Sequence, residues 1–197
     1  GLRYRVAAFF SDYTDIQVAG NPPGEFATVT TNAAEGEITG VEVELNWRPP
    51  AVPGFAVDAT FGWIEAEYTA FDEEVSVALT LEDEFIRTPQ FTWNMRASYE
   101  FDLGGDGFFT PAVDWTWRDD IHFEPVNNEF VFEDGYHNVD VSASWQSPDR
   151  TWRFTGGINN LTDAEYLIAG DSTDTIGYAL GVFARPRVWY LKLSRTF

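Results

Sequence analysis

The sequence predicts an all-β protein whose strands form a transmembrane antiparallel up-and-down β-barrel, or part of one. Three observations lead to this fold class. Apolar and polar residues alternate along several stretches, short turns alternate with long connections, and acidic residues gather in the long connections. Alternation with a period of two indicates strands with one apolar and one polar face. Short turns at one end and long loops at the other are typical of bacterial outer-membrane barrels.

The alternation is clearest in three stretches. Residues 41–48 (VEVELNWR) place Val, Val, Leu and Trp on one face and Glu, Glu, Asn and Arg on the other. Residues 91–102 (FTWNMRASYEFD) and 138–146 (NVDVSASWQ) show the same division. Helical spacing would scatter these residues around a cylinder, so each stretch is predicted to be a strand.

Applied to the whole chain, the same criterion predicts eight strands. They lie at about residues 2–18, 38–48, 55–64, 87–102, 108–117, 136–146, 151–162 and 184–197. Several are long enough to cross a membrane, which takes roughly 9 to 11 residues. The short connections contain Pro, Gly and Asp, as tight turns do; they are residues 49–54, 103–107 and 147–150. The long connections are residues 19–37, 65–86, 118–135 and 163–183.

Charge and aromatic residues support an oriented barrel. The four long connections hold 21 of the 32 acidic residues and one of the 12 basic residues, so the whole net charge of −20 lies at one end. Four Trp residues lie near predicted strand ends, where barrels carry aromatic girdles; they are Trp47, Trp63, Trp117 and Trp189.

Composition excludes several classes of protein and site. The chain has 197 residues, enough for one domain or for part of a larger one. It has no cysteine, hence no disulfide and no thiolate metal site. Nucleic acid is a poor partner for so acidic a chain, because binding it requires Lys and Arg. The sequence contains no run of about 18 apolar residues, so no transmembrane helix is predicted. No catalytic motif is found, so neither an enzyme nor a cofactor is expected.

The sharpest local feature is a set of acidic residues in the second long connection, Asp72, Glu73, Glu74, Glu82, Asp83 and Glu84. We expect them to hold divalent cations or to favour a cationic or neutral ligand, because a concentrated negative field attracts cations. An acidic surface that only promotes solubility is the alternative.

Two further sets of residues have alternative interpretations. His122 and His137 flank a connection with several acids, but a metal site needs three or four converging ligands, so we expect ordinary interface histidines. Charged residues on the polar faces of the strands either line a ligand path or form a mutually paired inner wall, and the wall is favoured. These residues are Arg3, Arg5, Glu42, Glu44, Arg48, Asp58, Arg96 and Glu100.

Several motifs, in the right order, resemble the TonB-dependent outer-membrane receptors, which take up ferric siderophores, vitamin B12, haem, sugars or peptides. LRYRVAAFFSDYTDIQV resembles a receptor strand with a tyrosine-rich end, and GVEVELNWRP with FAVDATFGWIEAEYTAF resembles the central barrel hairpin. RTPQFTWNMRASYEF resembles the next strand. Most specific are GGINNLTDAEY and the closing strand ARPRVWYLKLSRTF, which ends on an aromatic residue.

The resemblance implies a barrel of about 22 strands with a plugged lumen. Residues 1–197 would be the C-terminal portion, with the last eight strands as an open curved sheet. The plug domain and the segment that binds TonB have no counterpart in these residues. The implied function is TonB-dependent uptake of a scarce ligand, such as a ferric siderophore, across a Gram-negative outer membrane. The implied partners are outer-membrane lipid, the barrel-assembly machinery and, through the missing plug, the TonB system.

The last strand carries a further implication of the resemblance. Trp189, Leu191, Leu193 and Phe197 form one apolar face, and in such barrels the terminal strand is the signal that the assembly machinery recognises by adding a strand to an exposed edge. The C-terminus would then face the periplasm. The family's closing strand tends to carry an aromatic residue two positions before its last residue, and Arg195 occupies that place here.

Two alternatives remain open at the level of sequence. The chain could be a complete eight-stranded outer-membrane barrel, such as an adhesin or a structural protein, because eight is an allowed strand number. It could also be a soluble carbohydrate-binding β-sandwich in which exposed Trp residues form sugar platforms.

Overall fold

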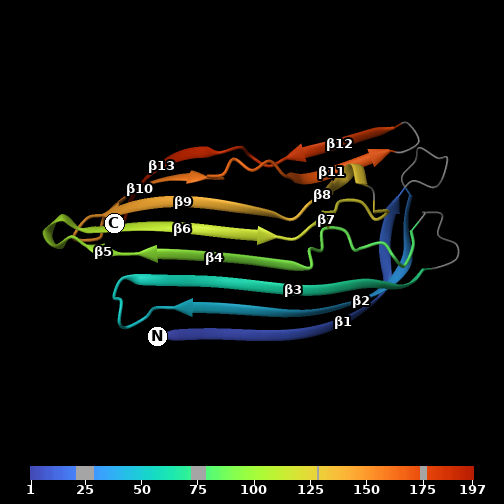
Figure 1. The fold of residues 1–197 in the computed structure, drawn as a ribbon, viewed down its shortest axis with the longest axis horizontal. Coiled ribbons are helices and arrows are strands. Elements are labelled where there is room, and N and C mark those ends of the chain that lie inside the picture. The colour runs from blue at the N-terminus through green and yellow to red at the C-terminus, as the bar shows by residue number, and fades with distance from the viewer. Residues whose placement is uncertain (21–28, 72–78, 128, 174–176) are drawn as a thin grey trace.

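The computed structural model describes residues 1–20, 29–71, 79–127, 129–173 and 177–197. Its main feature is one antiparallel sheet in which each of eight strands pairs with the next along the chain (Figure 1). These strands are β1 (Leu2–Gly20), β2 (Val29–Trp47), β3 (Phe55–Phe71), β4 (Phe91–Tyr99), β6 (Phe108–Arg118), β9 (Tyr136–Gln146), β10 (Trp152–Asn159) and β13 (Val188–Arg195). All eight predicted strands are therefore confirmed.

The alternation along each strand continues across the sheet, because directly paired residues point to the same face. One register row crosses all eight strands and is entirely apolar: Leu2, Trp47, Val57, Ala97, Val113, Val141, Ile158 and Trp189. The adjacent row is polar: Arg3, Asn46, Asp58, Arg96, Asp114 and Asp140. The sheet thus has an apolar face and a polar face, as a barrel wall does.

The two ends of the sheet differ. The short turns and both chain termini lie at one end, called here the turn end, and the long connections lie at the other, the loop end (Figure 1). The two-residue strand β5 (Phe101–Asp102) and the single-turn 3-10 helix η1 (Gly104–Asp106) lie at the turn end. The predicted division into short turns and long connections is confirmed.

All four long connections contain more strand than predicted. β2 begins at Val29 and β3 continues to Phe71, so residues 29–37 and 65–71 are strand. Glu35, Glu37, Glu65 and Glu67 stand where the alternation would place apolar residues, so these stretches do not show the pattern that predicts a strand with an apolar face. Residues 163–183 contain a hairpin of β11 (Leu167–Thr173) and β12 (Tyr178–Phe183). The connection after β6 holds β7 (Ile121–His122), η2 (Glu129–Val131) and β8 (Phe132–Glu133).

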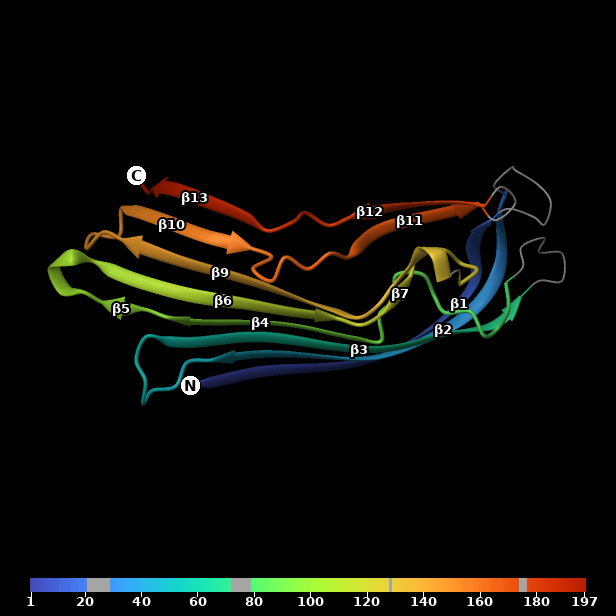
Figure 2. The ribbon, with the colours of Figure 1, turned by 45° about the horizontal axis from the view of Figure 1, so that its top comes forward.

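The sheet is open and single-layered, and Figure 2 shows its strands side by side with β1 and β13 at opposite edges. No pairing among the described residues joins these two edge strands. The chain therefore does not form a closed eight-stranded barrel, and in the part of the chain that the structure describes no second sheet packs face to face on the first, as it would in a sandwich. No helix in the described ranges is long and apolar enough to cross a membrane.

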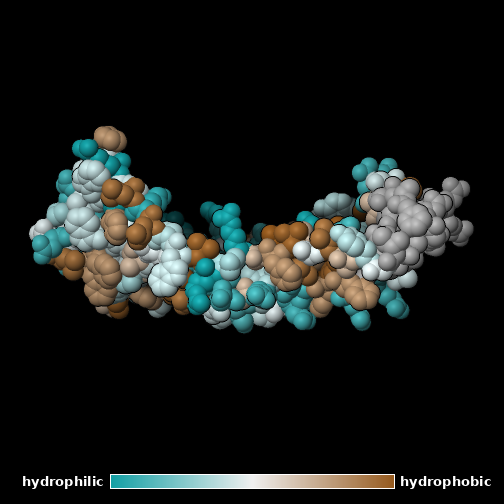
Figure 3. Space-filling model, turned by 90° about the horizontal axis from the view of Figure 1, so that it is seen from above, coloured by the Kyte–Doolittle hydropathy of each residue, from teal (hydrophilic) through white to brown (hydrophobic). Residues whose placement is uncertain are grey.

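Few side chains are buried in the main sheet, and its apolar face is exposed. Trp189 is 73% exposed and Leu191 is 76% exposed. Seen from the edge that carries β12 and β13, the molecule is bent, with apolar side chains in broad surface patches (Figure 3). Most of the buried hydrophobic residues form two clusters at the loop end, one around Tyr68 and one around Ile121. An apolar surface of this extent requires a partner phase or partner protein.

Candidate functional site

The polar face forms a wall of paired charges. The guanidinium of Arg48 donates from Nη2 to both carboxylate oxygens of Asp58, at 3.0 and 2.8 Å. Asn46 also donates to Asp58, at 2.9 Å. Arg96 bonds Asp114 at 2.6 Å across β4 and β6. The predicted inner-wall residues Arg5 and Glu44 pair at 3.2 Å, and Glu100 pairs with Arg150 at 3.0 Å. Cross-strand pairing of this kind supports the interpretation of these residues as a mutually paired wall.

At the loop end, residues 79–90 fold across the polar face. The rings of Phe85 and Tyr68 stack with centroids 4.2 Å apart and planes at 13°. Phe85 also lies directly over Gly36, where a Cβ atom would be 2.6 Å from its ring. Gly36 and Tyr68 occupy the positions that point to the polar face, in register with each other. Glycine at position 36 therefore makes room for a connection that covers part of the wall.

A second connection is joined to the first by an asparagine. Asn127 Oδ1 accepts a hydrogen bond from the Glu84 amide at 2.6 Å, and its Nδ2 donates to the Glu84 carbonyl at 3.2 Å. Asp83 Oδ1 accepts from the Asn127 amide at 3.0 Å, and Asp83 Oδ2 accepts from the Thr80 amide at 2.7 Å. Residues 79–90, 119–127 and 129–131 together form one layer, called here the loop layer.

A hollow of about 180 Å³ lies where the loop layer meets β3, and four acidic residues line it: Glu65, Glu84, Asp119 and Asp120. Glu84 lies 4.0 Å from His122 Nε2. Burial raises the pKa of Asp120, and the hydrogen bond with Asp119 raises it further. The described residues contain no group of three or more His, Cys, Asp or Glu side chains placed to hold a metal ion. The hollow suits a cationic group or a hydrogen-bond donor that enters from the loop end.

The structure separates the predicted acidic set. Asp72, Glu73 and Glu74 lie outside the described residues. Asp83 joins the two connections of the loop layer, Glu84 lines the hollow, and the amide of Glu82 donates to Thr80 Oγ1 at 3.2 Å. The sequence does not indicate Glu65, Asp119 and Asp120 as site residues. They come close to Glu84 only because residues 79–90 fold back over the sheet.

The two histidines lie in different surroundings. His122 contacts Glu84 and the ring of Phe132, whose centroid is 4.8 Å away. His137 lies on the apolar face, where its Nδ1 accepts a hydrogen bond from Trp115 Nε1 at 3.1 Å and its ring lies 4.4 Å from Trp117.

The hairpin of β11 and β12 is tied to the connection after β6 by two carboxylates. Glu124 accepts hydrogen bonds from the amide and the hydroxyl of Ser172, the latter at 2.6 Å. Glu133 accepts from the Leu167 amide at 2.7 Å. At the base of the hairpin, the rings of Tyr136 and Tyr166 stack at 3.9 Å, and burial raises the pKa of Tyr166. These pairs are more than 25 residues apart, so no local pattern indicates them.

Comparison with known proteins agrees with this architecture. A family model described as "TonB dependent receptor-like, beta-barrel" matches residues 1–161. No curated protein sequence matches the chain.

Solved structures share the fold at low sequence identity. The ferric yersiniabactin uptake receptor FyuA from Yersinia pestis matches all of this chain with a TM-score of 0.80 and 20% identity. The siderophore receptor PiuA from Acinetobacter baumannii matches 98% of it, with a TM-score of 0.71 and 16% identity. The copper transporter OprC matches all of it, with a TM-score of 0.72 and 15% identity. The chain spans only 28%, 26% and 29% of these three proteins, respectively.

Proposed function

Because the chain belongs to the TonB-dependent receptor β-barrel family, we propose that it forms the C-terminal portion of a receptor that takes up a scarce ligand across a Gram-negative outer membrane. This family consists of outer-membrane receptors and transporters rather than enzymes. One observation carries the proposal: an open wall with a lipid-compatible apolar face and a paired polar face, covered at one end by the loop layer. The rest of a barrel of about 22 strands, and the plug, would come from outside residues 1–197.

We place the loop end outside the cell and the turn end, with the C-terminus, in the periplasm. This orientation follows the general rule that short turns are periplasmic and long loops extracellular. Trp189, Leu191, Leu193 and Phe197 then form the assembly signal at the periplasmic end. Their exposure supports this role, since Phe197 is fully exposed and β13 has one unpaired edge among the described residues.

A ferric siderophore is the ligand class we propose. FyuA is a ferric yersiniabactin uptake receptor, PiuA is a siderophore receptor and OprC is a copper transporter. A siderophore receptor and a receptor for a ferric ligand are thus among the proteins that share the fold. The TonB system would supply the energy through the plug.

Growth under iron limitation tests the uptake function. The full-length gene is expressed in a Gram-negative strain without its own siderophore receptors, and a panel of ferric siderophores is supplied. We expect at least one siderophore to restore growth, and deletion of TonB to abolish this rescue. Equal rescue without TonB, or no rescue by any siderophore although the receptor is in the outer membrane, would contradict the proposal.

The acidic residues of the loop layer are proposed to attract a cation or a ligand with a cationic group. Changing Asp72, Glu73, Glu74, Glu82, Asp83 and Glu84 to Asn and Gln should weaken binding of calcium, or of the siderophore that restores growth, in calorimetric titrations.

Two single substitutions, one at Glu84 and one at Glu82, make this test more specific. Glu84 lines the acidic hollow and Glu82 does not, although both belong to the same connection. Glu84→Gln should lower affinity several-fold, while Glu82→Gln should leave it unchanged. Unchanged affinity in the six-residue variant would contradict the proposed role of these acids in binding.

A further inference from the structure

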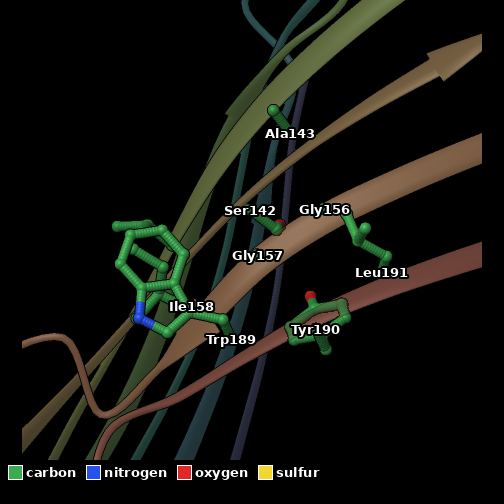
Figure 4. A pocket seen from close by; sticks show the side chains of 9 residues that line it. Ser142, Ala143, Gly156, Gly157, Ile158, Trp189, Tyr190 and Leu191 are labelled. Carbon is green, nitrogen blue, oxygen red and sulfur yellow. The ribbon is translucent and has the colours of Figure 1, made fainter.

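The apolar face carries a trough across β9, β10 and β13. Its volume is about 870 Å³, and its floor consists of the small residues Ala143 and Gly156, which pair directly across β9 and β10. Figure 4 shows the side chains of Trp189 and Leu191, which both come from β13 and lie apart from each other along that strand. The trough is a consequence of small residues in one register row.

Bulky residues border the trough on both sides. The row toward the loop end contains Val141, Ile158 and Trp189. The row toward the turn end contains Trp145, Phe154 and Leu193. All six point to the apolar face, so the trough is an apolar channel between two ridges.

A cation lies on the same face at the turn end of the trough. Arg195 alternates with Leu191 and Leu193 along β13 and pairs with Trp152. Its guanidinium carbon lies 4.9 Å from the ring centroid of Trp152 and 4.9 Å from that of Phe197. Arg5, Arg48, Arg96, Arg150 and Arg187 each pair with a carboxylate. Arg195 has no carboxylate within ion-pair distance among the described residues.

We propose that this surface binds one phospholipid, with the phosphate at Arg195 and an acyl chain in the trough. The inference rests on the proposed function, which places the apolar face in a bilayer. The guanidinium fork matches the geometry of a phosphate, and aromatic rings beside it belong at the level of lipid head groups. Four residues separate Arg195 from Leu191, or about 13 Å along a strand. An acyl chain that starts at the phosphate therefore crosses Leu193 and Phe154 and enters the trough.

Charge complementarity selects a lipid as the occupant. The surface offers the Arg195 guanidinium at its edge and a mainly apolar lining within, where only Ser142 and Tyr190 carry a hydroxyl. This is the division between the head group and the tails of a phospholipid. A protein partner with an apolar face would use the trough but would have no need of Arg195.

Native mass spectrometry of the delipidated full-length receptor tests the proposal. Phosphatidylglycerol and a diacylglycerol with the same acyl chains are titrated separately. We expect the receptor to bind phosphatidylglycerol at least five-fold more tightly. Arg195→Gln should abolish this preference. The matched control is Arg153→Gln, since Arg153 lies at the same end on the polar face, where it donates to Gln146 at 3.0 Å; the preference should persist.

A second variant tests the trough. Ala143→Leu fills the floor and should weaken binding of both lipids. Equal lipid binding by the Arg195 and Arg153 variants, or an Ala143→Leu variant that binds both lipids like the unchanged receptor, would overturn the proposal. Failure of the proposed function has a different outcome, because the unchanged receptor would then be missing from the outer membrane and would lack heat-modifiable gel migration. All variants are therefore first checked for this migration.

Discussion

At the scale of single residues, the sequence predicts where a turn lies but not which of its glycines the turn needs. The Gly- and Asp-rich segment 103–107 predicts a tight turn, but it contains three glycines that look equivalent. In the structure Gly107 has a φ of 93°, and a Cβ atom there would overlap the carbonyl of Gln146. At Gly105 a Cβ atom would meet nothing within 4 Å. Glycine is required at position 107 because of Gln146, the last residue of β9, which lies about 40 residues further along the chain.

Gly107→Ala should therefore destabilise the barrel, and Gly105→Ala should not. Gly107 has a ψ of −147° beside its positive φ, a conformation that costs about 1–3 kcal/mol for a residue with a side chain, and the overlap with a backbone carbonyl adds to this cost. The measurement is the urea concentration at which heat-modifiable migration of the full-length receptor is lost. Equal midpoints for the two variants would show that the turn can rearrange around Gly107.

The carboxyl pair in the hollow provides a second prediction at this scale. Asp119→Ala removes both the hydrogen bond and the charge that raise the pKa of Asp120, so this pKa should fall toward the ordinary value of 3.8. It should remain somewhat above 3.8, because burial is the larger cause. Carbon-13 carboxyl NMR during a pH titration measures the change. A pKa of Asp120 that stays the same would show that burial alone sets it.

The same shift has a consequence for stability. The folded-state pKa of Asp120 lies above the unfolded value, so the native state binds more protons. The loop layer should therefore lose stability as the pH rises from about 3.8 through the raised pKa. In the Asp119→Ala variant this loss should be smaller.

At the scale of elements, the strands were predictable but their extent at the loop end was not. In β3, Glu65 and Glu67 alternate with Ala66 and Tyr68, so the pattern is that of a strand with an acidic outer side. Tyr68, on the opposite side, is buried by Phe85 and by the cluster around Val18 and Ala34. Sequence periodicity does not contain these contacts. The hairpin of β11 and β12 has no strict alternation of apolar and polar residues, so the same criterion does not predict it.

Glu124 should be decisive for the position of this hairpin. Glu124→Ala removes the carboxylate that accepts hydrogen bonds from the Ser172 amide and hydroxyl, and a hydrogen bond to a charged group contributes about 1.5–3 kcal/mol. Hydrogen exchange at Leu167–Thr173 should accelerate about ten-fold or more, since about 1.4 kcal/mol corresponds to a factor of ten. Glu129→Ala is the control, because Glu129 is exposed in the same connection. Equal exchange in both variants would mean that β12 alone holds β11.

At the scale of the whole molecule, the order of the strands in the sheet and the face to which each strand residue points could be predicted from the sequence. The loop layer could not. Consecutive alternating segments with short turns leave little choice of topology, and the observed order is the simple meander. Within the candidate site, Glu84 was identified, while Glu65 and Asp119 required the fold. Asn127, which joins two connections 43 residues apart, has no local signal.

The open sheet leads to a prediction about autonomy. Exposed strand edges are not tolerated in lipid, because their backbone groups lack partners there. Residues 1–197 expressed alone should therefore aggregate or remain unfolded in detergent, whereas the full-length receptor should give a compact, heat-modifiable band. A monomeric heat-modifiable band from residues 1–197 would show that the two edges close on each other.

The length of β1 and β2 has a consequence for what meets the cell first. Each strand has 19 residues, or about 63 Å at 3.3 Å per residue, while the hydrocarbon layer is about 30 Å thick. In the proposed orientation, even with the usual tilt of about 40°, the hairpin rises well above the lipid surface. It is then an epitope that a circulating antibody or an adsorbing phage encounters before it reaches any pore, and antibodies against residues 29–37 should stain intact cells.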